Sequence, residues 1–190
     1  MASRGDESDG DLVQAALAGD NSAFSALMSR HKDGLYRFIR RYAGDAEEAF
    51  DLVQESFVAA WTALQGFDRS RSFPVWLRRI ALNKCRDWSR RRKVRQFFFG
   101  AAQLESVDRA PALSDADDEG TMEPRLAALD AAISALPSGL KEPLLLTSFE
   151  GMSHQEAAHL LQVTPKAIET RIYRAKLRLK AALNRAGGEG

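Results

Sequence analysis

Apolar residues recur at three- and four-residue intervals through most of this chain. That spacing gives an α-helix one apolar face, and it leaves few other choices of fold. No convincing apolar–polar alternation, the pattern of a half-buried strand, accompanies it. The clearest such face is expected to comprise Phe24, Leu27, Met28, Leu35, Phe38, Ile39 and Tyr42. We therefore predict an all-α protein.

Residues that start and stop helices divide this pattern into segments. Asp20 or Asn21 can cap the first helix, and Gly44 ends it. Asp45 and Glu48 form a capping-box pattern that starts a second helix, which runs to Trp61 or Leu64. A loop at 66–72 precedes a third helix that begins at Phe73-Pro74. Later helices are expected at about 126–136, 141–150, 157–161 and from 165 onward.

The composition changes after the third helix. Residues 100–122 contain Gly, Pro, Ser and an acidic run but few large apolar side chains, which is typical of a linker. We expect two small helical domains, residues 11–98 and 124–186, joined by a flexible linker at 99–123.

The last part of the chain has the pattern of a helix-turn-helix. Ser153 and Glu156 fit a capping box, and Thr164-Pro165 supplies an N-cap followed by a proline at the first helical position. The second helix is rich in cations: Lys166, Arg171, Arg174, Lys176, Arg178 and Lys180. Two packed helices with a solvated basic face are the alternative. The two capping signals and the number of arginines favour a helix that binds a DNA groove.

The helix from Phe73 is a second candidate for DNA binding. Its cations surround Asn83: Arg78, Arg79, Lys84, Arg86, Arg90, Arg91, Arg92 and Lys93. Cations neutralise phosphates and Asn can pair with adenine. The alternative is a solvated face, but so many cations repel one another without a polyanion. Trp76 and Trp88 on this helix either pack in the core or stack on unpaired bases.

An acidic face is expected on the helix that starts at Asp45. Asp51, Gln54, Glu55 and Val58 are spaced at i, i+3, i+4 and i+7, so they share one side of the helix. Two interpretations remain open: an ordinary solvated face, which these residues alone favour, and a docking surface for a basic helix.

Other functional classes find little support in the sequence. His31, His154 and His159 are too scattered for a metal site, and neither a catalytic triad nor a phosphate-binding Gly loop is present. We predict no enzymatic activity, no metal and no cofactor. With no signal peptide at 1–11, no membrane-length apolar run and one cysteine, a cytoplasmic location is expected. Cys85 is either a core residue or a redox sensor. The run Phe97-Phe98-Phe99 is expected to pack on a domain or a partner.

Three motifs, taken together, resemble the extracytoplasmic-function (ECF) sigma factors of bacterial RNA polymerase. Residues 46–57, AEEAFDLVQESF, are similar to the core-binding helix of region 2. Residues 73–83, FPVWLRRIALN, resemble the F-x-x-W-L-x-x-I-A-x-N stretch of the same region. Residues 136–137, 149–158 and 168–176 resemble region 4. The similarity covers about residues 11–184, apart from the linker.

The resemblance implies a function for each surface. It implies that Asp51, Gln54 and Glu55 contact the beta-prime clamp helices of core RNA polymerase, with the beta flap as a further contact. It implies that the loop at 66–72 captures a flipped base, and that the minus-ten promoter element is bound by Arg79, Asn83, Lys84, Arg86, Asp87, Arg90 and Arg91. It implies that the minus-thirty-five element is bound by Lys166, Glu169, Thr170, Arg171, Tyr173, Arg174 and Arg178.

The resemblance also implies an anti-sigma factor that holds the chain inactive until a stress signal. Glu169 departs from the family pattern, since a cation is frequent there, and altered promoter choice is the hypothesis that follows. The alternative functions are a stand-alone helix-turn-helix regulator and a helical adaptor with no DNA role.

Overall fold

The computed structural model describes residues 7–100 and 122–187, and within these ranges every regular element is helical. The predicted all-α class is confirmed. In chain order the elements are α1 (Asp9–Leu17), α2 (Asn21–Ala43), α3 (Ala46–Ala63), the 3₁₀ turn η1 (Leu64–Gly66), α4 (Phe73–Gly100), α5 (Met122–Ser134), α6 (Ser138–Ser148), α7 (His154–Leu161) and α8 (Pro165–Gly187). Most of the predicted linker, residues 101–121, lies outside the described residues.

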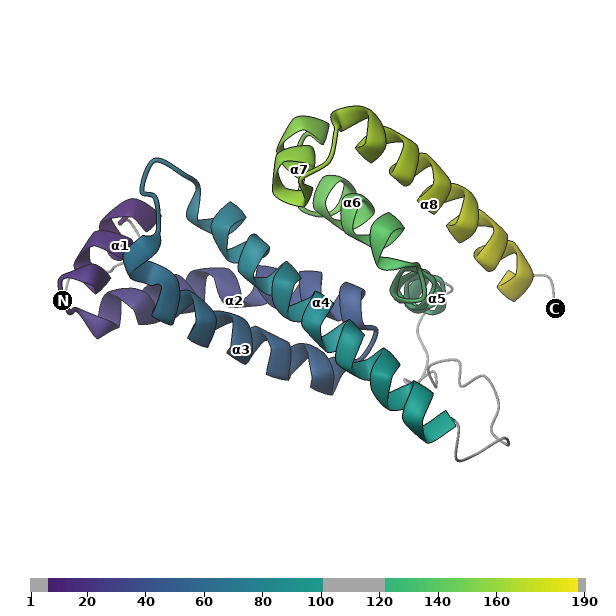
Figure 1. The fold of residues 1–190 in the computed structure, drawn as a ribbon, viewed down its shortest axis with the longest axis horizontal. Helices are drawn as coiled ribbons and strands as arrows, with labels where there is room; N and C mark the ends of the chain where they lie inside the picture. Colours follow the sequence, from purple (N-terminus) through teal and green to yellow (C-terminus); the bar gives the residue numbers. More distant parts are fainter. Residues whose placement is uncertain (1–6, 101–121, 188–190) are drawn as a thin grey trace.

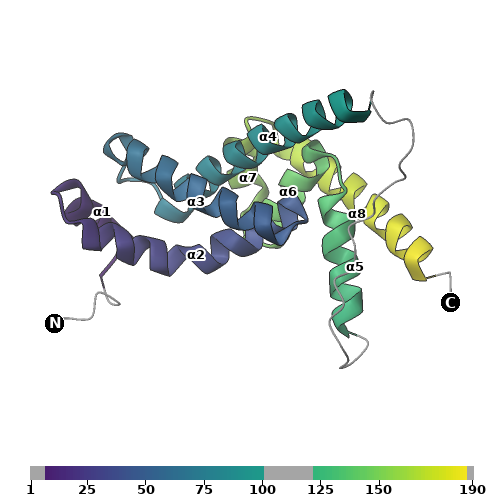
Figure 2. The same ribbon diagram turned by 90° about the horizontal axis from the view of Figure 1, so that it is seen from below.

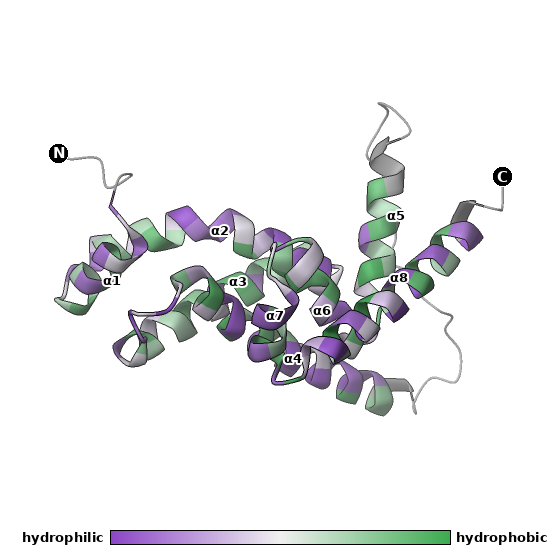
Figure 3. Cartoon of the chain, turned by 90° about the horizontal axis from the view of Figure 1, so that it is seen from above, coloured by the Kyte–Doolittle hydropathy of each residue, from purple (hydrophilic) through white to green (hydrophobic). Residues whose placement is uncertain are grey.

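The helices form two bundles that lie against each other (Figure 1). In the first, α2, α3 and α4 pack along their lengths and α1 packs on α2. In the second, α8 packs against α5, α6 and α7. Figure 2 shows α5 crossing the direction of α2 near the end of that helix. Hydrophilic residues, purple in Figure 3, recur along both α4 and α8. None of the described helices is long and apolar enough to cross a membrane.

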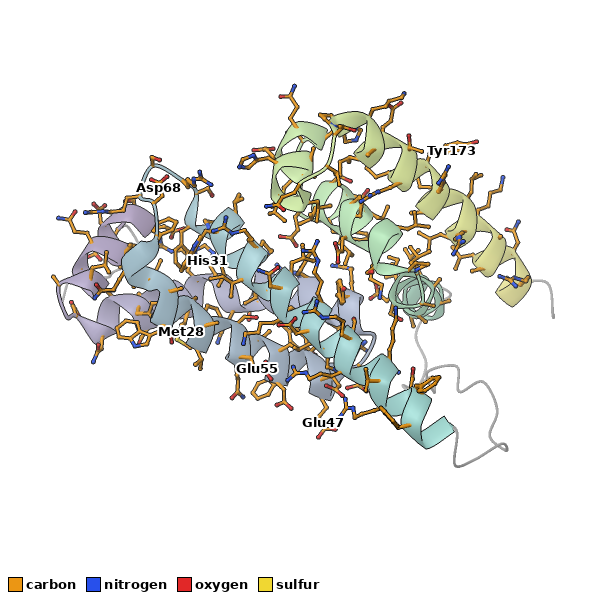
Figure 4. The ribbon with its side chains drawn as sticks, in the orientation of Figure 1. Met28, His31, Glu47, Glu55, Asp68 and Tyr173 are labelled. Atoms are coloured by element: carbon orange, nitrogen blue, oxygen red, sulfur yellow. The ribbon has the colours of Figure 1, made fainter. Side chains whose placement is uncertain are left out.

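The core of the first bundle follows the predicted face of α2, with one exception. Leu27, Leu35, Phe38 and Ile39 are each at most 1% exposed. Met28, predicted for the same face, is 37% exposed and lies at the edge of the bundle (Figure 4). Periodicity places a residue on a face, but it does not show whether a neighbouring helix covers that point of the face.

The short helix α1 was not predicted. Its nine residues are too few for a clear apolar period, yet Ser8 and Asp11 form a capping box at its start. Leu12 and Val13 are fully buried. The carboxylate of Asp9 bridges to Arg30 at 2.7 Å and His31 at 2.9 Å, which fixes α1 on α2.

Two capping boxes were predicted from the sequence, and the structure confirms one of them in full. The capping box of Ser153 and Glu156 is confirmed, with hydrogen bonds of 2.8 and 3.2 Å in the two directions. The pattern at Asp45 is only half correct. Asp45 accepts from the backbone N–H of Glu48 at 2.9 Å, but the Glu48 carboxylate instead accepts from Trp88 Nε1 at 2.6 Å. A buried indole N–H requires an acceptor. The Glu48 carboxylate is that acceptor, and the hydrogen bond joins α3 to α4.

The end of α2 is a contact point between the bundles. Lys141 Nζ donates to the carbonyl oxygens of Tyr42 at 2.8 Å and Ser134 at 2.5 Å, and burial lowers the pKa of Lys141 to about 8. Gly44 ends α2 with φ of 79°, a conformation that favours glycine. A β-carbon on Gly44 would lie 2.6 Å from Ser134 Oγ. Close packing of the end of α2 against Ser134 of the second bundle therefore also favours glycine at position 44.

The three phenylalanines at the end of α4 differ from expectation. Phe97 is 77% exposed and Phe98 is 70% exposed, and their rings meet edge-on at 6.0 Å. The prediction that this run packs on a domain is therefore wrong for these two residues, because α4 extends beyond the helices that cover its first half (Figure 1). Packing on a partner stays a prediction, and the side chain of Phe99 lies outside the described residues.

Cys85 is fully buried on α4, and burial raises the pKa of its thiol to about 12. Because the thiolate is the reactive form, the structure favours a core residue over a redox sensor. We predict that Cys85 in the native chain reacts with a thiol reagent at least about 100-fold more slowly than in guanidinium at the same pH. Absorbance of the released thiol chromophore measures both rates. Similar rates would contradict the burial of this side chain.

Candidate functional site

The outward face of α3 carries acidic and apolar side chains together. Asp51 and Gln54 are exposed and Glu55 is partly exposed, so the structure brings the three predicted residues onto one surface. The helix holds them there because Leu52, Phe57 and their neighbours fix its other side in the core. Figure 4 shows Glu47 and Glu55 on the outer edge of the bundle.

Large apolar side chains also lie on α3 where a soluble helix would be expected to bury or avoid them. Phe50 is 59% exposed, Val58 is 67% exposed and Trp61 is 43% exposed. Exposed apolar residues beside charges are a feature of protein-binding surfaces. The sequence prediction included Val58 but missed Phe50 and Trp61. Their spacing from Gln54 and Val58, at i, i+4, i+8 and i+11 from Phe50 to Trp61, was the available signal.

Glu55 also faces the cations of α4. Its carboxylate lies 3.8 Å from Lys84 Nζ and 3.8 Å from Arg91 Nη2. Exposed pairs of this length contribute little to stability, on the order of 0–1 kcal/mol. These contacts therefore leave Glu55 available to a partner at small cost.

The predicted minus-ten residues divide into two groups on α4. Arg79, Asn83, Arg86 and Arg90 follow one another at i, i+4, i+7 and i+11, so they share one face. Asp87 is beside this face and forms an ion pair with Arg90. Lys84 and Arg91 lie further round the helix, towards Glu55. Arg79, Asn83 and Arg90 are exposed.

Both tryptophans of α4 are core residues. Trp76 is 8% exposed and Trp88 is 6% exposed. The interpretation of these side chains as core packing is therefore confirmed, and stacking on bases is excluded for them in this arrangement. Arg92 lies over the Trp88 ring at 5.3 Å, which keeps one cation of the basic run close to the helix.

The loop before α4 forms a cationic hollow. Phe67 anchors it, since its ring packs at 4.9 Å from Trp76 and 5.8 Å from Phe73. At the tip (Figure 4) Asp68 accepts from Ser70, and these hydrogen bonds lower the pKa of Asp68. Beside this loop is a cavity of about 480 Å³, lined by Asp9, Gly10, Arg30, Phe67, Arg69, Arg71, Ser72, Phe73 and Pro74. The contribution of α1 and α2 to this cavity was not predicted.

The helix-turn-helix has the geometry that its caps predict. α7 ends at Leu161 and is capped by Gln162, which has φ of 57°, and Thr164 Oγ1 accepts from the N–H of Ala167 at 3.2 Å. Ile168, Ile172, Ala175 and Leu179 face the bundle and are at most 8% exposed. The outer face of α8 is therefore left for solvent or a ligand.

That outer face contains most of the predicted minus-thirty-five residues. Lys166, Thr170 and Tyr173 follow at i, i+4 and i+7, and Tyr173 is 64% exposed and points away from the bundle (Figure 4). Glu169 and Arg174 flank them and are exposed, whereas Arg171 and Arg178 lie further round the helix. A shallow cavity of about 450 Å³ is lined by His154, Glu169, Thr170, Ile172, Tyr173 and Lys176. His154 of α7 was not predicted to share this surface.

Glu169 is paired within its own helix. Its carboxylate lies 2.8 Å from Lys166 Nζ, and this hydrogen bond lowers the pKa of Glu169. One predicted DNA-binding cation is thus partly neutralised by its neighbour. Among the described side chains, no group of three metal-binding residues is assembled.

Two cationic helices on separate helical bundles, one of them in a helix-turn-helix, are typical of a DNA-binding protein. A third helix, α3, exposes acidic and apolar side chains together. The chain matches the family models Sigma-70 region 2 over residues 27–95 and Sigma-70, region 4 over residues 126–179. The chain belongs to the ECF sigma factors, which are transcription initiation factors of bacterial RNA polymerase.

Relatives and solved structures agree with this assignment. The chain is 40% identical over 184 residues to the RNA polymerase sigma factor CnrH of Cupriavidus metallidurans, covering 94% of this chain and 96% of CnrH. It is 32% identical over 189 residues to the ECF RNA polymerase sigma factor SigE of Mycolicibacterium smegmatis, covering 97% and 71%. Its fold is similar to that of CnrH in complex with the cytosolic domain of CnrY, with a TM-score of 0.66, 32% identity and coverage of 94% and 99%.

Proposed function

We propose that this chain binds core RNA polymerase through α3 and directs initiation at promoters that carry a minus-ten and a minus-thirty-five element. Asp51, Gln54 and Glu55 contact the beta-prime clamp helices, and the second domain contacts the beta flap. The observation that carries the proposal is the joint exposure of these three residues beside Phe50 and Val58, on a helix whose other side is fully packed.

The α4 face and the loop before it bind the minus-ten element in this proposal. Asn83 pairs with a base edge while Arg79 and Arg90 neutralise phosphates. A base flipped from the non-template strand enters the cavity lined by Arg69, Arg71 and Phe73. Flipping costs a few kcal/mol of unstacking, so contacts in that cavity favour the melted strand over the duplex.

The outer face of α8 reads the minus-thirty-five element in the major groove. Lys166, Thr170 and Tyr173 form the centre of that face, with Glu169 and Arg174 beside them. Arg171 and Arg178 lie further round, where they contact the phosphates that border the groove. Reading two elements with two domains, about 11–98 and 124–186, requires the linker at 99–123 to span the distance between them.

An anti-sigma factor is the proposed regulator, and the cytoplasm is the proposed location. The solved relative CnrH is bound to the cytosolic domain of CnrY. Phe97 and Phe98 are exposed and supply a candidate contact for such a partner. The chain itself catalyses no reaction and needs no cofactor in this proposal, because polymerisation is the work of the core enzyme.

In vitro transcription tests this function directly. Purified core RNA polymerase is combined with the chain and a pool of promoter fragments, and the transcripts are sequenced. We expect initiation only at templates that share two spaced elements, and only when the chain is present. A folded chain that supports no initiation on any template would overturn the proposal.

Glu169→Gln is expected to change the base preference of the chain at the minus-thirty-five element. The substitution removes a carboxylate that can accept from a cytosine amino group, and it releases Lys166 to contact phosphate. We expect a change of about 5- to 100-fold at one base position, the range of one good base contact. Promoter-pool transcription measures it, and Asp33→Asn, which removes an exposed carboxylate of α2, serves as the control. An unchanged profile rejects a role for Glu169 in base readout.

A further inference from the structure

Arg86 belongs to the proposed minus-ten surface, yet a carboxylate of the other domain already binds it. Nε and Nη2 of Arg86 donate to the two oxygens of Glu142 at 2.9 and 2.6 Å. This two-pronged geometry is the one an arginine uses for a phosphate. Glu142 is only 6% exposed on α6, so it is held against α4 between the two domains. The Glu142 carboxylate thus engages the two donors of Arg86 that could otherwise bind a DNA phosphate.

A second set of contacts repeats this arrangement. Arg78 Nε of α4 donates to Glu150, beyond the end of α6, at 2.5 Å, and both side chains are mostly buried. Arg41 of α2 forms an ion pair with Asp130 of α5 at 3.2 Å and lies over the Phe149 ring at 4.5 Å. In these three ion pairs the cation comes from the first domain and the carboxylate from the second. The contact is therefore complementary in charge.

The same arrangement brings the two DNA-reading elements too close together for a promoter. Arg79 of α4 and Gln162-Val163, in the turn that leads into α8, line one cavity of about 770 Å³. Elements at minus ten and minus thirty-five are about 25 base pairs apart, which is roughly 85 Å along duplex DNA at 3.4 Å per base pair. In this arrangement α4 and the start of α8 are separated only by that cavity, which is much smaller than the distance between the two promoter elements. The domains must separate before both elements can be bound.

The ion pairs at this interface are suited to reversible closure. Burying a charge costs desolvation free energy that offsets much of its attraction to a partner. When the domains separate, Arg86 and Glu142 both regain water, so neither is left as a buried unpaired charge. DNA then supplies a replacement anion for Arg86.

We propose that the chain inhibits itself by closing: Glu142 of the second domain binds Arg86 of α4 and competes with promoter DNA until the domains separate, and the ion pair of Arg78 with Glu150 helps to hold the domains together. The inhibition of DNA binding rests on the proposed function, but the contact between the two domains can be measured without polymerase.

Glu142→Arg in the full chain tests the contact. The substitution places two arginines face to face, so we expect the radius of gyration from X-ray scattering to increase by several ångströms. Asp33→Arg is the matched control, since it reverses an exposed carboxylate of α2 and should leave the radius unchanged. Arg86→Glu combined with Glu142→Arg restores an ion pair of opposite polarity and should restore the compact radius. Circular dichroism checks folding, and Glu150→Arg provides a second variant if Glu142→Arg does not fold.

Duplex DNA from the promoter pool tests inhibition. We expect Glu142→Arg to bind it about tenfold more tightly than Asp33→Arg, because apparent affinity scales with the fraction of open chain. An unchanged radius overturns the closed contact. Expansion without a gain in affinity over Asp33→Arg overturns its inhibitory role. A wild-type chain that never directs initiation, with Glu142→Arg nevertheless expanded, rejects the proposed function and leaves the closed contact standing.

Discussion

Asp51→Arg is expected to lower the affinity of the chain for core RNA polymerase by about 100-fold. Asp51 is exposed at the centre of the α3 face and is proposed to meet basic clamp helices. Reversing its charge replaces an attraction with a repulsion, and disrupting a close interfacial charge pair costs about 2–5 kcal/mol. Titration of labelled chain with core enzyme measures the dissociation constant, and transcription at saturating chain should recover.

The control for Asp51→Arg is Asp33→Arg, which makes the same charge change on α2, away from the proposed docking face. Both variants should keep the melting temperature of the wild-type chain, because each replaces an exposed side chain. Equal core affinity for Asp51→Arg and wild type would show that α3 is not the docking surface. Equal loss in both variants would attribute the effect to overall charge.

Asn83→Ala is expected to reduce open-complex formation by about tenfold or more. Asn83 is exposed between Arg79 and Arg90 on one face of α4, where its amide can pair with a base edge. A good bidentate base contact contributes about 1–3 kcal/mol of discrimination. Alanine favours the helix, so α4 should remain intact. Permanganate reactivity of unpaired thymines measures the melted promoter directly.

Gln96→Ala provides the matched control for Asn83→Ala, since it removes an exposed amide from the same helix, between three and four turns later. We expect that variant to melt promoters as wild type does. The loss in Asn83→Ala should also depend on the base at one promoter position, because Asn83 is proposed to contact a base and not a phosphate. A uniform loss over all promoters would instead assign Asn83 to phosphate binding.

Helix positions were predictable because local signals determine them. Asp20, Gly44 and Ser153 supply caps that act over a few residues, and the apolar face of α2 is long enough to show its period. α1 escaped notice because nine residues give too few repeats. Glu48 was assigned to a cap because sequence alone does not reveal that a buried indole, forty residues later, competes for its carboxylate.

The sequence could predict which residues share a helix face, but it could not predict which residues of other helices contact that face. Spacing alone grouped Asp51 with Glu55, whereas Arg79 and Asn83 were grouped by the many cations of their helix and by the family resemblance. The pairing of Arg86 with Glu142 depends on how two domains meet, and fifty-six residues separate the partners. No local pattern carries that information. The same holds for Arg30, which reaches the loop cavity from α2.

Gly44 carries a constraint that neither domain alone would impose. Its left-handed backbone terminates α2, and the absence of a side chain there admits Ser134 to van der Waals distance. Any larger residue would act as a wedge between the halves of the molecule. Substitutions at Gly44 should therefore separate two requirements, a left-handed backbone and close contact with Ser134. Asparagine can adopt the left-handed backbone, but its side chain would collide with Ser134, so its effect reports the contact between the two halves alone.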